Sequence, residues 1–170
     1  MKLEDAIKTA IEFETKVTTN YDEAARKTAD PVGKKVFETL AKEEQGHIAY
    51  LRSRLDEWKK TGHVTAASLE TAIPSAAKIK EGMSKLKANR DKRPPAEGEL
   101  RFLQRALELE VETSGFYKKM VAELDSEGQN LFKRFVEIEE GHVTIVQAQI
   151  DSVTGLGFWF DMQEFQLEGA

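Results

Sequence analysis

The chain has 170 residues, of which 40% are hydrophobic and 32% charged, so its length and composition predict one globular domain with a sizeable core. A net charge of −5 argues against nucleic acid or an anionic membrane as a partner, because an acidic surface repels both. The absence of cysteine excludes disulfides, thiolate metal sites and iron–sulfur clusters. No stretch approaches the ~20 apolar residues that span a bilayer, and we expect a cytoplasmic protein.

The first half of the chain predicts two long amphipathic helices, over residues 3–28 and 31–60. In the first, apolar residues recur every three or four positions, at Leu3, Ile7, Ala10, Val17, Tyr21 and Ala24. Asp30-Pro31 separates the helices, because proline disfavours helix in the preceding residue but is accepted at a helix start. Gly62 is a stop signal for the second helix.

Residues 63–95 are predicted to form a connection, since their apolar side chains are small and sparse and the stretch ends in a polar run and Pro94-Pro95. Short helices are possible at 68–71 and 75–88. A connection of this length can cross from one end of a helix bundle to the other.

The second half predicts two more amphipathic helices, over residues 96–124 and 129–153. Residues 125–128 form the turn between them, and Gly155 and Gly157 end the last helix. The fold class expected is all-α, a four-helix bundle over residues 1–155 with a long crossover between its second and third helices. The aromatic tail at 156–170 is too apolar for water and should pack on the bundle or on another subunit.

The two halves of the sequence resemble each other. Residues 10–21 align without a gap with residues 106–117, and residues 37–47 align with residues 132–142. Each half is therefore a helix hairpin with the same polar residues at the same depth. We infer a duplication and a pseudo-two-fold axis through the bundle.

Six polar residues of this repeat are candidate metal ligands. Glu44 and His47 lie three positions apart on one helix and so can reach one metal ion, and Glu139 and His142 repeat the arrangement. Glu14 and Glu110 occupy matching places within the core-facing stripes of the other two helices. The predicted ligand set is Glu14, Glu44, His47, Glu110, Glu139 and His142.

Four carboxylates can be buried near one another only if cations neutralise them or their pKa values rise steeply. Two divalent cations would balance four carboxylates, and each imidazole adds a neutral nitrogen ligand. This set of oxygen and nitrogen donors suits iron or manganese. A glutamate on each of two helices with Glu-x-x-His on each of the others is the pattern of ferritin-like di-iron and di-manganese bundles.

On these motifs the chain resembles the rubrerythrin branch of the ferritin-like superfamily, over residues 3–29, 31–60 and 96–153. The resemblance implies two iron ions, with Glu44 and Glu139 bridging them and with Glu14 and Glu110 as terminal ligands. It also implies that Tyr21 and Tyr117, seven residues after the first glutamates, hydrogen-bond a ligand or donate an electron. The implied activity is reduction of hydrogen peroxide or dioxygen, and we expect a homo-oligomer, with a dimer favoured.

The sequence departs from that family in two ways. It has no cysteine for a rubredoxin domain, so the electrons must come from an external donor, a rubredoxin-like protein or another reductase. It has Thr113 where rubrerythrins carry an extra glutamate. The same six ligands equally resemble bacterioferritin-type ferroxidase centres, so iron oxidation and handling is an alternative. A metal-free helical interaction module is an alternative of another class.

Several neighbouring residues are not assigned to the centre. Five glutamates lie off the stripe or are unmatched between the halves, and we interpret them as surface groups or as neighbours of the ligands: Glu12, Glu43, Glu108, Glu112 and Glu140. His63 is expected at the surface. Gly46 and Gly141 each cost a helix about 1 kcal/mol relative to alanine, so their recurrence beside both histidines predicts close helix packing or a local backbone adjustment.

Overall fold

The structure is a computed structural model that describes residues 1–86 and 96–162. The described residues form five α-helices and a short π-helix, without a strand, which confirms the all-α prediction. They are α1 (Leu3–Lys27), α2 (Pro31–Thr61), α3 (Ala76–Lys85), α4 (Glu97–Glu123), α5 (Ser126–Asp151) and η1 (Ser152–Leu156). Within these ranges no helix is both long and apolar enough to cross a membrane. The predictions made for 87–95 and for 163–170 lie outside the described residues.

The first two helices lie within one residue of the predicted bounds, and capping groups explain the bounds of α2. The Asp30 carboxylate accepts hydrogen bonds from the backbone N–H groups of Val32 and Gly33, which begin α2, and Pro31 occupies its first turn. Gly62 ends α2 in the left-handed conformation, with φ of 72°. These local signals therefore set the bounds of α2.

The start and end of α5 differ from the prediction. The helix begins at Ser126 rather than at 129, because Asp125 is its N-cap and accepts a hydrogen bond from the Gly128 N–H at 3.1 Å. At its other end the helix passes into η1, and Gly157, with φ of 82°, ends that segment, whereas Gly155 lies within it. Of the short helices expected in the connection, only α3 forms, with Ser75 as its N-cap.

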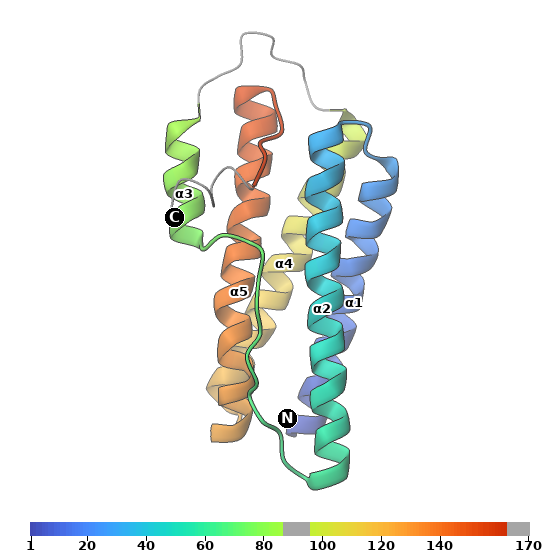
Figure 1. Cartoon of the computed structure of the whole chain (residues 1–170), viewed down its shortest axis with the longest axis vertical. Coiled ribbons are helices and arrows are strands. Elements are labelled where there is room, and N and C mark those ends of the chain that lie inside the picture. Colours follow the sequence, from blue (N-terminus) through green and yellow to red (C-terminus); the bar gives the residue numbers. More distant parts are fainter. Residues whose placement is uncertain (87–95, 163–170) are drawn as a thin grey trace.

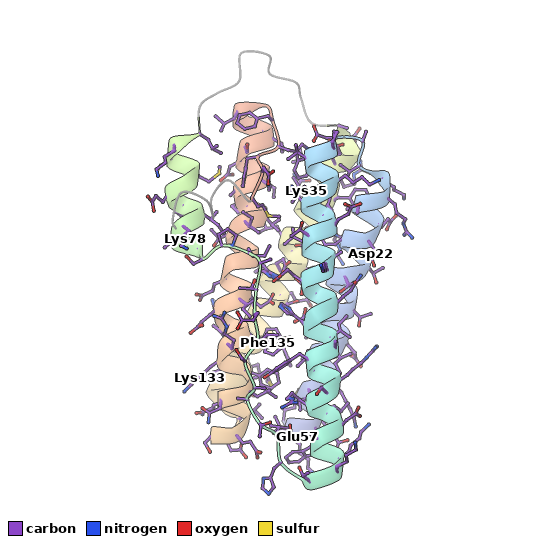
Figure 2. All side chains as sticks on the ribbon, viewed as in Figure 1. Asp22, Lys35, Glu57, Lys78, Lys133 and Phe135 are labelled. Atoms are coloured by element: carbon purple, nitrogen blue, oxygen red, sulfur yellow. The ribbon has the colours of Figure 1, made fainter. Side chains whose placement is uncertain are left out.

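Figure 1 shows α1, α2, α4 and α5 running alongside one another, with α3 beside α5. The helices α1 and α2 contact each other closely, as do α4 and α5, and α1 also packs on α4. Their inner faces are apolar and their outer faces charged. On α5, for example, Phe135 is buried in the interior while Lys133 is exposed (Figure 2).

The core is divided into two apolar clusters. The Phe37 cluster contains Val17, Tyr21, Phe37, Leu40, Leu103, Ile145, Val146 and Trp159, among others. The Phe132 cluster contains Ile7, Leu51, Tyr117, Met120, Phe132 and Phe135, among others. Along α2 and α5 the buried residues between the two clusters include a glutamate and a histidine on each helix. A polar layer is thus enclosed between two apolar ones.

The segment 62–75 runs lengthwise along the molecule from the end of α2 towards α3 (Figure 1). Side chains from both α2 and α5 hold it. Tyr50 of α2 donates a hydrogen bond to the Ala67 carbonyl at 2.7 Å, and Arg134 of α5 donates one to the Leu69 carbonyl at 3.1 Å. The segment therefore covers the seam between α2 and α5.

The described part of the C-terminal tail packs back on the helices. Trp159 lies against Phe37, with ring centroids 5.3 Å apart, and over the backbone of Gly33. The Gln149 side-chain amide donates to the Phe160 carbonyl and accepts from the Phe160 N–H, at 2.9 and 3.3 Å. These contacts bury both aromatic side chains.

Candidate metal centre

The six predicted ligands come together in the polar layer between the two apolar clusters. They project from four helices: Glu14 from α1, Glu44 and His47 from α2, Glu110 from α4, and Glu139 and His142 from α5. Each is at most 1% exposed. Burial this complete is unusual for charged side chains and requires a compensating charge.

The six predicted ligands form two overlapping groups of four, each compact enough to hold one cation, and a third group joins Glu43 to His47 and His142. One group of four consists of Glu14, Glu44, His47 and Glu139, and the other of Glu44, Glu110, Glu139 and His142. Within each group one ligand atom per residue lies within 4.8 Å of all the others. Because Glu44 and Glu139 belong to both groups, the arrangement suits two cations that share two carboxylates.

Both imidazoles present Nδ1 to the carboxylates. His47 Nδ1 lies 2.9 Å from Glu44 Oε2 and 3.5 Å from Glu14 Oε2. His142 Nδ1 lies 2.7 Å from Glu44 Oε1 and 3.6 Å from Glu110 Oε1. The two rings are nearly parallel, with centroids 5.4 Å apart. One nitrogen donor therefore faces each group of carboxylates.

Two tyrosines hold the outer carboxylates by reciprocal hydrogen bonds. Tyr21 of α1 donates to Glu110 Oε1 of α4 at 2.5 Å, and Tyr117 of α4 donates to Glu14 Oε1 of α1. Burial, followed by the Glu110 carboxylate, raises the pKa of Tyr21 well above its ordinary value, and burial and Glu14 do the same for Tyr117. Both phenols therefore keep their protons and orient the carboxylates. A redox role for either tyrosine stays a prediction.

The remaining polar atoms of the cluster lack hydrogen-bond partners, and this tests whether a cation fits. Oε2 of Glu14 and Glu110 is unpartnered, as are both carboxylate oxygens of Glu44 and Glu139. Both ring nitrogens of His47 and His142 are unpartnered too. The short Nδ1–carboxylate separations are therefore contacts without hydrogen-bond geometry. Buried polar groups are almost always satisfied, so these atoms fit metal ligands well.

The electrostatics of the cluster also favour cations. Burial and the Glu44 carboxylate raise the pKa of Glu14 to about 8, and burial raises that of Glu139 well above its ordinary value. Burial opposes charge on His47, but the carboxylates of Glu44 and Glu14 outweigh it and raise the pKa to about 10. Burial likewise opposes charge on Glu44, but His142 and His47 lower its pKa well below the ordinary value. Without cations, bound protons must offset the negative charge of the carboxylates.

Glu43 lies next to the centre and connects it to the segment 62–75. Its Oε2 is 3.6 Å from His142 Nε2, the nitrogen that faces away from the cluster. The same carboxylate accepts hydrogen bonds from the Thr71 hydroxyl at 2.6 Å and the Ala72 N–H at 2.7 Å. Sequence reasoning left Glu43 out of the ligand set, since its only signal was its position before Glu44. A carboxylate beside the outer nitrogen of a ligating histidine orients the ring.

The other expectations have mixed outcomes. The hydroxyl of buried Thr113 donates to the Leu109 carbonyl at 2.8 Å and so is committed to the helix backbone. His63 is exposed, as predicted, and so are four of the five unassigned glutamates: Glu12, Glu108, Glu112 and Glu140. Gly141 is closely packed, but against the segment 62–75 rather than against a helix, since an added Cβ would lie 3.2 Å from the Pro74 carbonyl oxygen. Close helix packing is wrong at Gly46, where an added Cβ would meet nothing within 4 Å.

Comparisons with known proteins give no match: no protein-family model, no curated protein and no solved structure matches this chain significantly. The case for a metal centre therefore depends on the geometry and chemistry of the cluster itself.

Proposed function

We propose that this chain is a ferritin-like di-iron oxidoreductase of the rubrerythrin type, which reduces hydrogen peroxide or dioxygen with electrons from an external donor. The single observation that carries the proposal is the pair of buried four-residue groups that share Glu44 and Glu139. The order of the helices supports a four-helix bundle in which the connection between α2 and α4, predicted over residues 63–95, is the crossover.

When bound, a pair of iron ions supplies two one-electron redox changes, which match the two electrons that hydrogen peroxide needs to become water. Glu44 and Glu139, which belong to both groups, would help to hold both ions, and Glu14 with His47 and Glu110 with His142 would complete the two sites. Tyr21 and Tyr117 hold the outer carboxylates in place and keep a proton beside each of them. The two apolar clusters limit the access of water.

Ferroxidase activity is the second candidate, and one observation favours it. Thr113 stands where the rubrerythrins have an additional carboxylate, and its hydroxyl is bonded to the helix backbone. The six predicted ligands of this chain are of the same types as those that a ferroxidase centre uses. Manganese in place of iron would use the same oxygen and nitrogen donors. A metal-free interaction module accounts poorly for the unpartnered buried atoms.

Metal analysis tests the proposal. The protein is loaded anaerobically with Fe(II), desalted, and analysed for iron beside Glu44→Ala and Glu139→Ala. The matched control is Glu140→Ala, which removes an exposed carboxylate next to Glu139. We expect stoichiometric iron in the wild type and the control, and its loss from both variants. Equal iron contents in all four proteins, or none in the wild type, would overturn the proposal.

Oxidation rates separate the two candidate activities. The iron-loaded protein is mixed with hydrogen peroxide or with dioxygen, and the oxidation is followed by absorbance. A marked preference for peroxide supports peroxide reduction by an external electron donor. Repeated turnover of added Fe(II) with dioxygen, together with an accumulating ferric mineral, supports the ferroxidase alternative.

A further inference from the structure

The outer side of the candidate centre carries a third group of ligand-type residues. Glu43 lies with His47 and His142 so that one carboxylate oxygen and one nitrogen of each ring are within 4.8 Å of one another. Two imidazoles and one carboxylate form a donor set that binds Fe(II) and leaves other coordination positions open. We call these three residues the outer group. It shares one histidine with each of the two groups of four, which we call the inner groups.

An unpartnered nitrogen lies beside Glu43. His142 Nε2 is 3.6 Å from Glu43 Oε2, and it has no hydrogen-bond partner although the ring is completely buried. On the other side of the ring, Nδ1 lies 2.7 Å from Glu44 Oε1. His142 therefore has a carboxylate next to each nitrogen, one of the outer group and one of the inner groups. A neutral imidazole has one unprotonated nitrogen, so the ring can bind a cation on either side but not on both at once.

Glu43 lies closer to solvent than the six predicted ligands. Its side chain is 12% exposed, whereas none of those six side chains is more than 2% exposed. It is located at the seam between α2 and α5, which pack on each other less closely than α1 and α4 do and are bridged by the segment 62–75 (Figure 1). At the α1–α4 seam the rings of Phe13 and Phe116 meet, with centroids 4.9 Å apart. The path from solvent to the centre therefore follows the α2–α5 seam.

We propose that the outer group is an entry position, at which each divalent cation binds before it moves into the centre. This inference rests on the proposed function, because it requires the inner groups to bind cations. When a cation moves from Nε2 to Nδ1 of a histidine, the proton on Nδ1 is released to water and Nε2 takes one up from water. The ring thus keeps its charge, and the outer position is free for the next cation.

One entry position serves both inner groups. His47 belongs to one inner group and His142 to the other, and the outer group contains both. The residue of α5 that matches Glu43 is the apolar Ile138, so the second half of the repeat supplies no carboxylate at this place. Uptake of both cations should therefore depend on Glu43.

Cation uptake measured without redox chemistry tests this proposal. The metal-free full chain is mixed with increasing concentrations of Co(II) in a stopped-flow instrument, and the visible absorption of bound Co(II) follows uptake. Because binding at the outer group precedes the inward movement, the wild-type rate should level off at high Co(II). Glu43→Gln keeps the size of the side chain but removes its charge. It should lower the uptake rate of both cations about tenfold or more, which is the range of rate enhancement by opposite charge in a cleft.

Two further variants give the test its specificity. Glu140→Gln is the matched control, because it removes the same charge from an exposed residue beside Glu139 and should leave uptake unchanged. Thr71→Val removes a hydrogen bond between Glu43 and the covering segment but keeps the charge, and it should not slow uptake. If Glu43 only orients His142, Glu43→Gln will instead raise the release rate of one cation and leave both uptake rates at the wild-type value.

The outcomes separate the entry position from the centre itself. Unchanged uptake rates in Glu43→Gln, or equal slowing by Glu43→Gln and Thr71→Val, would overturn the entry position and leave the proposed function intact. Absence of Co(II) binding by the wild type would overturn the metal centre and the entry position with it.

Discussion

The two halves of the repeat are alike near the centre and at the helix starts. Asp30 and Asp125 hold matching positions and cap α2 and α5, each accepting a hydrogen bond from the N–H of a glycine three residues later. Tyr21 and Tyr117 each bond a glutamate of the other half. These matches concern charge neutralisation and helix geometry, which both halves must satisfy in the same way.

Outside the ligands the halves differ. Glu43 lies beside His142, whereas the matching position of α5 carries the apolar Ile138. Gly141 lies under the Pro74 carbonyl, but its counterpart Gly46 faces open space. The difference arises because the segment 62–75 contacts both Glu43 and Gly141. The two candidate cation positions are therefore inequivalent in their surroundings although their candidate ligands match.

The largest expected effect is the rise in Tm caused by Fe(II). It should differ between glutamates that belong to both groups and glutamates that belong to one. A cation that binds only the folded chain adds about 2.7 kcal/mol to the free energy of unfolding when its free concentration is 100 times its Kd. We expect anaerobic Fe(II) to raise the Tm of the wild type strongly. Glu44→Ala should abolish this rise because Glu44 belongs to both groups, and Glu14→Ala should leave part of it because Glu14 belongs to one.

Thermal scans with and without Fe(II) measure these shifts, with Glu140→Ala as the exposed control. Glu110→Ala should resemble Glu14→Ala, since Glu110 serves only the other group. If Glu14→Ala loses the whole shift, as Glu44→Ala does, the idea of two separately occupied positions is wrong.

The next effect concerns Glu43, which only one half possesses. Glu43→Gln removes the negative charge 3.6 Å from His142 Nε2, and changes of this kind lower metal affinity about 10–100-fold. The loss should fall on the cation held by His142. Competition with a chelator, followed for each of the two binding steps, measures it.

Thr71→Val separates charge from packing in this test. It removes a hydrogen bond from the Glu43 carboxylate at 2.6 Å but leaves the charge in place. We expect a smaller loss of affinity than with Glu43→Gln. An equal loss would mean that Glu43 acts through the covering segment rather than through His142.

The helices and the six clustered residues could be predicted from the sequence because both are periodic. A glutamate such as Glu14 within an apolar stripe must face the core wherever the helix packs. Asp125 was predicted within a turn because of the following Gly128, yet it is a capping residue, and the start of α5 was therefore wrong by three residues. Here two local signals conflicted, and the cap prevailed.

Features that depend on nonperiodic segments could not be predicted. The role of Glu43 depends on where Thr71 and Ala72 cross α2, and no pattern in the sequence gives that path. The tail was expected to pack on the bundle or on another subunit, but the position of Trp159 over Gly33 depends on tertiary contacts. The binding of iron by the six residues stays a prediction.

Alanine substitutions at two matching glycines should have a smaller effect, a decrease in the free energy of unfolding. Cβ atoms added at Gly33 and Gly128 would lie 2.6 Å from Trp159 Cε2 and 2.7 Å from Leu124 Cβ, respectively. Overpacking of this kind costs typically about 1–3 kcal/mol, so both alanine variants should be less stable in urea unfolding. In a Trp159→Leu background the cost of Gly33→Ala should shrink, while that of Gly128→Ala should not. An unchanged cost at Gly33 would contradict the packing of Trp159 on this helix.

The smallest expected effect on the free energy of unfolding comes from alanine substitutions at Gly46 and Gly141. It should differ between the two halves of the repeat. Alanine at Gly46 adds a side chain in open space, and it should stabilise α2 by about 1 kcal/mol through helix propensity. Alanine at Gly141 has the same propensity gain, but its Cβ would lie 3.2 Å from the Pro74 carbonyl oxygen, so the net gain should be smaller. Urea unfolding of both variants without metal measures the difference, which reports how firmly the segment 62–75 is held against α5. Equal gains would mean that this segment moves aside freely and does not constrain the position of Glu43.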